Sequence, residues 1–324
     1  YTCIANLVPF GKKQSENQKT ALSLAFNSAI NDVYRSSLRS WKKIVQGYVL
    51  ENTDFLLGLL PEIEFVGKGT QLQESLRARG CTICEPDLRP MDEHVFVADR
   101  LYNPAVALKL PEGETIVPNS IAFDTTPENA MIYVLTGPNR GGKSVITCAV
   151  GLCQVMLQLG MFLPADTCRI SPADGIYTHF PTGADDTIDK GRLGEECARL
   201  GEIFDAVTAD SLVLLDESLS STGSFEASYI AAEVLMGLCR VGCRCLFSTH
   251  LHELAAEIDR INAQSAAEGG PRVDTLVAGI EGEGKRSFVI KRAKPDGKSY
   301  ARDIASRYGL TYEGILQRIG KEKR

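Results

Sequence analysis

The chain has 324 residues, of which 44% are apolar and 23% charged, and its net charge is −6 at pH 7. This is ordinary globular composition, and the length suffices for one large hydrophobic core or two smaller ones. The negative charge is the wrong sign for a segment that holds DNA mainly through its phosphates, so we expect this segment to contribute little to DNA binding. The sequence shows neither a run of about 20 apolar residues nor a signal-peptide pattern. It therefore predicts a cytoplasmic protein without a membrane span, whose ten cysteines are mostly buried and reduced.

Residues 1–94 are predicted to form a helical arm that ends in a proline-containing linker. Over residues 22–48 the apolar side chains recur at steps of three and four, which predicts one amphipathic helix of about 27 residues. A helix on a membrane surface would carry the same stripe, but packing against a neighbouring helix is its commoner cause. A second helical stretch, over residues 55–78, is expected to be interrupted at Pro61 and Gly67.

From about residue 95 the pattern changes to short apolar runs that alternate with helical segments. This alternation is typical of an α/β protein with a parallel sheet flanked by helices. The clearest core strands are predicted at residues 132–135, 212–215 and 245–248, and a helix is predicted at 145–159. The chain is thus expected to divide near residue 95 into an arm and an α/β domain.

The segment GPNRGGKS, residues 137–144, has the spacing G-x-x-x-x-G-K-S of a loop that binds nucleotide phosphates. Gly137, Gly141 and Gly142 would let backbone N–H groups turn toward a β-phosphate, where a Cβ atom would block the approach. Lys143 supplies a positive charge to the β and γ oxygens, and the hydroxyl of Ser144 is a ligand for Mg²⁺. A helix that begins here directs its positive end at the phosphates. These residues predict nucleotide binding, but they do not say what the nucleotide does.

Two further strands are followed by side chains that suit a phosphate site. The segment SLVLLDE, residues 211–217, places Asp216 to hold Mg²⁺ and Glu217 to polarise an attacking water at the carboxyl edge of the sheet. An acidic pair after an apolar run is more often a turn that faces solvent, but the glycine-rich loop upstream favours the catalytic interpretation. His250 follows the next strand and is placed to sense a γ-phosphate, with a capping or solvent-facing histidine as the plainer alternative.

The order of these motifs resembles the ATPase domain of the MutS family of DNA mismatch-repair proteins. The resemblance runs from about residue 101 to about residue 310 and rests on GPNRGGKS, LGMFLPA, DGIYTHFPTGADD, SLVLLDE and FSTHLHEL, in that order. It implies an ABC-type P-loop NTPase fold over residues 95–310, followed by a tail over 311–324. It also implies two composite ATP sites that form across a dimer.

The resemblance assigns roles by position. Glu217, His250 and Lys143 would act in catalysis, with Glu217 orienting water and His250 as a switch. ATP and Mg²⁺ would be held by Pro138, Asn139, Gly141, Gly142, Lys143, Ser144, Val145 and Asp216.

Several positions depart from the family pattern. The trans segment that would reach the partner's ATP falls at residues 191–196, GRLGEE, where Gly191 and Arg192 replace the family's usual Ser-Thr pair. An arginine there could meet the partner's γ-phosphate or lie on the surface. Ile116 replaces a phenylalanine that stacks on adenine, and an assisting histidine falls near Arg292, whose guanidinium could stack instead. The loop over residues 216–224 is DESLSSTGS where the family has DEIGRGTST. These changes predict a MutS-like paralogue.

The favoured hypothesis is a Mg²⁺-dependent ATPase of the MutS type that forms a homodimer and passes its nucleotide state along the helical arm. The alternative is a module in which ATP holds two chains together and hydrolysis is negligible, and the altered trans segment favours it. Another ABC-class machine is disfavoured because no LSGGQ-like segment precedes Leu212.

Overall fold

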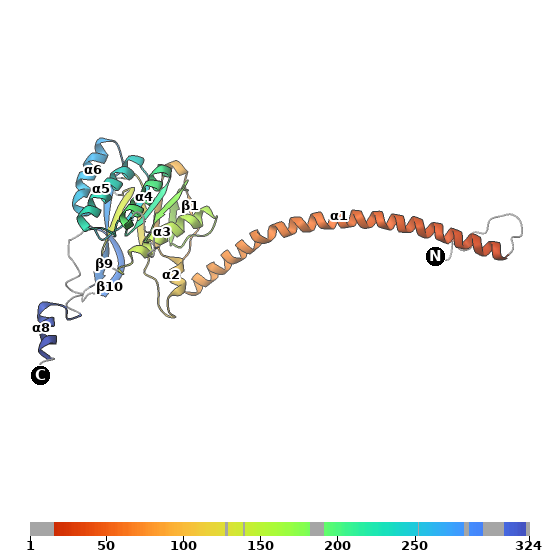
Figure 1. The fold of residues 1–324 in the computed structure, drawn as a ribbon, viewed down its shortest axis with the longest axis horizontal. Coiled ribbons are helices and arrows are strands. Elements are labelled where there is room, and N and C mark those ends of the chain that lie inside the picture. The colour runs from red at the N-terminus through yellow and green to blue at the C-terminus, as the bar shows by residue number, and fades with distance from the viewer. Residues whose placement is uncertain are drawn as a thin grey trace. The chain divides into compact units, whose positions relative to one another are not determined.

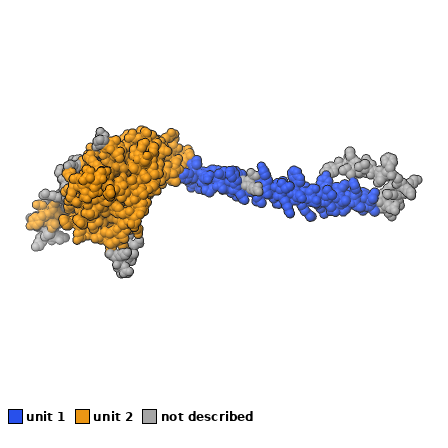
Figure 2. Space-filling view, turned by 90° about the horizontal axis from the view of Figure 1, so that it is seen from above, with its two compact units in different colours: residues 1–68 blue, residues 69–324 orange. Residues whose placement is uncertain are grey.

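The computed structural model describes residues 16–126, 129–138, 140–181, 191–251, 253–281, 285–293 and 308–321. The chain divides into two compact units, residues 1–68 and 69–324 (Figure 2). The first unit is helical, and the second carries both sheets. The boundary expected near residue 95 falls within the second unit.

Helix α1 runs from Glu16 to Ala78 and has 63 residues. The interruption expected at Pro61 and Gly67 is wrong, because both residues lie inside the continuous helix. A proline removes one backbone N–H from the ladder, and the turns on either side keep their own hydrogen bonds. Large apolar side chains along α1 are exposed, Trp41 by 69%, so nothing in the described part of the chain covers the predicted stripe. Neither α1 nor any other described helix has an apolar stretch of the length that crossing a bilayer requires.

The second unit is built around a six-stranded sheet with the order β10-β9-β4-β8-β7-β6. In that order the strands are Lys285–Arg292, Val273–Glu281, Ile132–Thr136, Arg244–Ser248, Leu212–Asp216 and Ile176–His179. Strands β9 and β10 at the edge of this sheet lie side by side (Figure 1). All neighbouring pairs are parallel except β10 with β9. The three predicted core strands are confirmed as β4, β7 and β8, and they lie side by side. Their continuous apolar runs suit a parallel sheet that is buried on both faces.

Alternate residues of these strands pack into two different cores. The first core joins the sheet to helix α3 (Lys143–Gln158) and to a smaller sheet, and its strand residues include Tyr133, Leu135, Leu212, Leu214 and Leu246. The second core joins the opposite face to α4 (Gly191–Ala206), α5 (Ser224–Val241) and α6 (Leu254–Ala267), through residues that include Ile132, Val134, Val213, Leu215 and Phe247. All nine described cysteines are unpaired, and five of them are buried in these cores. The predicted mixed α/β class, with a parallel-rich sheet and flanking helices, is confirmed.

The smaller sheet has the order β1-β5-β2-β3, with strands Asp87–Leu88, Thr167–Ile170, Phe96–Leu101 and Asn119–Phe123. A 3₁₀ turn, Met91–Glu93, precedes β2, helix α2 (Pro104–Lys109) follows it, and helix α8 (Tyr312–Lys321) lies near the end of the chain. A third cluster contains Leu76 from the last turn of α1, Tyr102, and Ala107 of α2, with Ile116 packed against it. This cluster joins the end of α1 to the segment between β2 and β3.

Arg244, the first residue of β8, is fully buried. Its guanidinium donates hydrogen bonds of 3.1 to 3.3 Å to four backbone carbonyl oxygens, those of Val95, Ser171, Pro172 and Asp210. Burial lowers its pKa to about 10, so the group stays charged at neutral pH. One side chain therefore holds together the chain segments that flank β2, β5 and β7.

Candidate functional site

The loop between β4 and α3 has a backbone geometry that favours glycine. Gly137 has φ +138° and Gly142 has φ +95°, conformations that residues with a side chain rarely adopt. A Cβ atom on Gly141 would lie 2.9 Å from the carbonyl oxygen of Pro138, which already accepts a hydrogen bond from the Gly141 N–H at 3.1 Å. Asn139, the other predicted phosphate ligand of this loop, lies outside the described residues. The three glycines leave the loop backbone bare at the start of α3.

Lys143, the first residue of α3, is only 3% exposed. Its Nζ atom donates to the carbonyl oxygens of Gly137 at 3.0 Å and Pro138 at 3.4 Å. Burial lowers the pKa of Lys143, while the charges of Glu217 and Asp216 oppose that shift. A buried ammonium group whose partners are mainly neutral carbonyls is costly unless an anion joins it. The position therefore suits an anionic ligand.

Asp216 ends β7, is 3% exposed, and lies opposite Ser248 of β8. Its Oδ1 atom and the Ser248 hydroxyl are both buried, and neither has a hydrogen-bond partner among the described residues. Mg²⁺ prefers oxygen ligands and is usually held by one or two carboxylates together with substrate phosphates. The unpartnered carboxylate oxygen of Asp216, whose charge acts on Lys143, suits such an ion as a ligand. The hydroxyl oxygen of Ser144, in the first turn of α3, is a second suitable ligand.

The three predicted catalytic side chains form one hydrogen-bonded chain. Nε2 of His250 lies 2.7 Å from Oε1 of Glu217, and Nδ1 of His250 lies 3.4 Å from Nζ of Lys143. Because an ammonium group can only donate, Nδ1 accepts and Nε2 carries the proton that is shared with Glu217. Glu217 also has φ +50°, which is uncommon for a residue other than glycine. The structure thus brings a cation, an imidazole and a carboxylate together at the carboxyl edge of the sheet.

A cavity of about 490 Å³ lies beside the loop. Ile116, one of the two predicted base contacts, lines this cavity. Arg292, the other, is not among its lining residues, and its Nε atom donates instead to Asp274 of β9. The loop, the start of α3 and the end of β7 contribute part of the lining, namely Arg140, Gly141, Gly142, Lys143, Ser144, Val145 and Glu217. The segment from β2 to β3 contributes further polar residues, namely Tyr102, Asn103, Glu114, Thr115 and Asn119.

Phe288 of β10, which belongs to none of the sequence motifs, also lines the cavity. Its φ is +55°, and the pairing of β10 with β9 shifts register between Arg286 and Ile290. Irregularities of this kind redirect a side chain and are common beside functional sites. The side chain of Asn119 bonds to the carbonyl oxygen of Phe288 and to the N–H of Ile290, at the C-terminal end of the irregularity. No strand was predicted over β10, and an aromatic residue alone does not reveal the bulge.

Gly191 and Arg192, the predicted trans segment, form the start of α4. Gly191 has φ +66°, and Arg192 is exposed. Neither residue lines the cavity of its own chain, so the predicted role concerns the site of a second chain.

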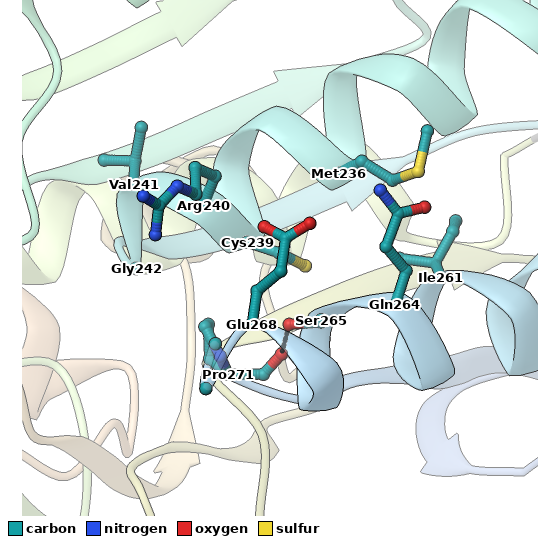
Figure 3. Close-up of a pocket in the computed structure, with 12 residues that line it drawn as sticks. Met236, Cys239, Arg240, Val241, Gly242, Ile261, Gln264, Ser265, Glu268 and Pro271 are labelled. Atoms are coloured by element: carbon teal, nitrogen blue, oxygen red, sulfur yellow. Dashed lines mark hydrogen bonds between the residues drawn. The ribbon is translucent and has the colours of Figure 1, made fainter.

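A second cavity, of about 220 Å³, lies between the C-terminal ends of α5 and α6 (Figure 3). It shares no lining residue with the first cavity, and its charged residues are Arg240 and Glu268. Ser265 there donates to the carbonyl oxygen of Pro271 at 2.7 Å. Among its described residues it has neither a buried cation nor a buried carboxylate without a hydrogen-bond partner. The cavity at Lys143 is therefore the stronger candidate for a phosphate ligand.

Fold and site together define a mixed α/β protein in which a glycine-rich loop and Glu217 line one cavity. Asp216 and His250 adjoin Glu217 and are not among the lining residues. Residues 133–293 match the family model described as MutS domain V, and the chain belongs to the MutS family. It is 33% identical over 218 residues to the DNA mismatch repair protein MutS of Myxococcus xanthus, a match that covers 66% of this chain and 23% of that protein.

Two other relatives give a similar picture. The DNA mismatch repair protein MutS of Salinibacter ruber is 37% identical over 216 residues, covering 64% of this chain and 22% of that protein. The probable DNA mismatch repair protein Msh6 of Drosophila melanogaster is 38% identical over 175 residues, covering 53% of this chain and 14% of that protein. The chain thus spans less than a quarter of the length of these relatives.

Proposed function

We propose that the second unit contains an ABC-type P-loop ATPase domain that binds ATP with Mg²⁺ and hydrolyses it. The observation that carries the proposal is the buried ammonium group of Lys143 beside a cavity of about 490 Å³, with an unpartnered oxygen of Asp216 at a nearby strand end. Both groups are costly in an empty site, and a triphosphate with its metal ion would satisfy both.

In this proposal the loop holds the phosphates through Pro138, Asn139, Gly141, Gly142, Lys143, Ser144 and Val145. Ser144 and Asp216 hold Mg²⁺, which when bound neutralises charge on the β- and γ-phosphates. Glu217 orients the attacking water and His250 responds to the γ-phosphate. His250 forms hydrogen bonds with both Lys143 and Glu217. When ATP binds, Lys143 would exchange its contact with His250 for one with a phosphate oxygen.

We assign the base to the part of the cavity between Ile116 and Phe288. An aromatic ring and an aliphatic side chain can hold the faces of a purine. Arg292 is left out of this assignment because its guanidinium pairs with Asp274 away from the lining.

We place this domain in a MutS-like DNA repair or recombination protein that works as a nucleotide-gated dimer. Its parts would be an arm and linker over residues 1–94, the ATPase domain over 95–310 and a tail over 311–324. The second chain is a copy of this one or a related MutS-type chain. Gly191 and Arg192 would approach the γ-phosphate of the ATP that this second chain binds. DNA would be bound mainly by other parts of the full protein, because this chain has a net charge of −6.

The second candidate function is a dimerisation module that binds ATP but hydrolyses it negligibly. The replacement of a Ser-Thr pair by Gly191 and Arg192 favours it, because this segment would complete the partner's site. Light scattering with and without ATP, combined with phosphate release, separates the two functions: association without turnover identifies the module.

Two substitutions test the main proposal. Lys143→Ala should abolish ATP binding, while Glu217→Gln should keep ATP bound and lower turnover by about 10²-fold or more, the usual range for loss of a catalytic base. Glu257→Gln is the matched control, because Glu257 is an exposed residue of α6 that pairs with Arg260. If both site variants hydrolyse ATP as fast as the unmodified chain, the proposal is wrong.

A further inference from the structure

A polar pair that the proposed mechanism does not use lies beside the two carboxylates. His179 is the last residue of β6, where it pairs with Leu215 of β7, so it reaches the same sheet edge as Asp216. Its Nδ1 atom lies 2.7 Å from Oγ of Ser218, the residue directly after Glu217. Both His179 and Ser218 are 3% exposed. The pair is therefore a buried contact between the end of β6 and the loop that carries the proposed catalytic carboxylate.

The hydrogen-bonding pattern fixes the direction of this contact. Burial, and then the charge of Arg199, lower the pKa of His179, so its ring is neutral at pH 7. Oγ of Ser218 also lies 3.5 Å from the carbonyl oxygen of His179. If Nδ1–H donates to Ser218 and the Ser218 hydroxyl donates to that carbonyl, both polar groups are satisfied. Nε2 of His179 is then left buried and without a partner among the described residues, a cost that an apolar side chain would avoid.

The backbone on either side of Ser218 explains what the contact can do. Glu217 has φ +50° and Leu219 has φ +65°, so both neighbours of Ser218 in the chain are non-glycine residues with a positive φ. Such conformations persist when surrounding contacts hold them, and they cluster at functional sites. The Ser218 side chain is the anchor between these two residues, and the direction of the Glu217 carboxylate depends on the turn that it anchors.

A second hydrogen bond ties the same loop to α4. Oγ of Ser221 donates to Oε2 of Glu196 at 2.8 Å. Glu196 lies in the second turn of α4, the helix that begins with the trans segment at Gly191. The loop after the carboxylates is thus bonded on one side to β6 and on the other to the helix that would meet the partner chain.

We propose that His179 is a positioning residue that holds Ser218 and thereby fixes the turn that aims Glu217, and that the bond between Ser221 and Glu196 couples this turn to α4. This inference rests on the proposed hydrolysis of ATP. His179 touches neither nucleotide nor water in this scheme. It acts through Ser218.

The experiment compares turnover and ATP affinity in the full chain with Ser218→Ala, His179→Leu and the double variant. Each single substitution should lower kcat by about tenfold and leave the Kd for ATP within about twofold, because a misdirected catalytic group slows the chemical step without weakening binding. The double variant should be no slower than either single one, since both remove the same contact. Ser218→Thr and His179→Asn keep the hydroxyl and the hydrogen-bonding nitrogen, and they should restore most of kcat.

Two further substitutions in the same loop serve as a control and as a second test. Thr222→Val removes a hydroxyl that bonds locally to Glu226, and it should leave kcat within about twofold. Ser221→Ala should lower kcat and leave ATP affinity unchanged. Suppose that the unmodified chain hydrolyses ATP. If the single variants then lose ATP affinity and kcat together, or if the double variant shows the sum of the two single effects, His179 is only a packing residue and the inference is overturned. If the unmodified chain binds ATP and shows no turnover, the proposed hydrolysis fails first, which this design registers separately.

Discussion

The side-chain amide of Asn119 holds the backbone on both sides of Val289, within the irregularity that contains Phe288. Its Nδ2 atom donates to the carbonyl oxygen of Phe288 at 3.1 Å, and its Oδ1 atom accepts from the N–H of Ile290 at 2.6 Å. One residue of β3 in the smaller sheet thereby shapes β10 in the larger one. The ring of Phe288 lies over the loop, where its Cδ1 atom would be 3.6 Å from a Cβ on Gly142.

Phe288→Ala should weaken ATP binding by about tenfold, because loss of a stacked aromatic ring costs on the order of 1–3 kcal/mol per base. The same variant should bind inorganic tripolyphosphate as well as the unmodified chain, because its loop and Lys143 are intact. Titration calorimetry with both ligands measures the difference. Phe288→Trp keeps a stacking ring and should retain most ATP affinity, and Phe225→Ala removes an 82% exposed ring as a control. An equal loss for both ligands would mean that Phe288 supports the loop and does not contact the base.

Asp216→Asn should raise the Mg²⁺ concentration that half-saturates turnover by at least about tenfold, because even outer-sphere partners of a metal site contribute 10- to 100-fold to affinity. The amide keeps the shape of the side chain and removes the charge that attracts the ion. Titration of ATPase activity with Mg²⁺ at fixed ATP checks the shift. Asp92→Asn, in the exposed turn before β2, is the neutral comparison. An unchanged Mg²⁺ curve would remove Asp216 from the proposed metal site.

The low pKa of His179 predicts a pH dependence of stability. Burial holds that pKa below 6.5, so at mildly acidic pH the unfolded chain binds a proton that the folded chain does not. The free energy of unfolding should therefore rise with pH up to about 6.5 and be free of this contribution above it. Asp124 and Asp174 also have lowered pKa values, but these groups titrate below 3.8, outside the window.

Urea unfolding between about pH 7.5 and pH 5 measures this slope. His179→Asn lacks the titrating ring and should show a flatter dependence than the unmodified chain. Identical slopes in the two proteins would show that His179 takes up its proton as easily in the folded chain as in the unfolded one.

Arg244→Met should lower the free energy of unfolding by about 3 kcal/mol, since it removes a charged donor from four carbonyl oxygens. Those of Val95 and Ser171 keep a second donor, whereas those of Pro172 and Asp210 lose the one that Arg244 supplies. For a unit of this size the melting temperature should fall by about 6–12 °C. Arg260→Met, on the exposed face of α6, should change it little. Calorimetry of both variants makes the comparison. A melting temperature equal to that of the control would show that water or backbone movement replaces the lost donors.

Much of the fold could be predicted because its signals are local. The apolar runs that became β4, β7 and β8 are continuous, as strands buried on both faces must be, and the loop from Gly137 to Ser144 follows the first of them directly. The order of the carboxylates and His250 after their strands was enough to predict that they share one edge. The hydrogen bonds among Lys143, Glu217 and His250 agree with that expectation.

The parts that could not be predicted depend on contacts between distant segments. Phe288 reaches the cavity through a shift in strand register that is held by Asn119, which is 169 residues away in the chain. His179 was part of a quoted motif, but its partner Ser218 could be found only from the pairing of β6 with β7. The break expected in α1 was wrong for a different reason. Pro61 and Gly67 each lower the stability of a helix locally, but this free-energy cost alone does not determine whether the neighbouring turns stay helical.

Ile116 has two sets of neighbours, the cavity on one side and the cluster around Leu76 on the other. A close-packed interior transmits small displacements, since a side chain cannot move without changing the space left to its neighbours. Any molecule that shifts Ile116 as it enters the cavity must also repack the final turn of α1. A substitution at Leu76 should therefore alter the wall of the cavity through Ile116, although Leu76 itself does not line it.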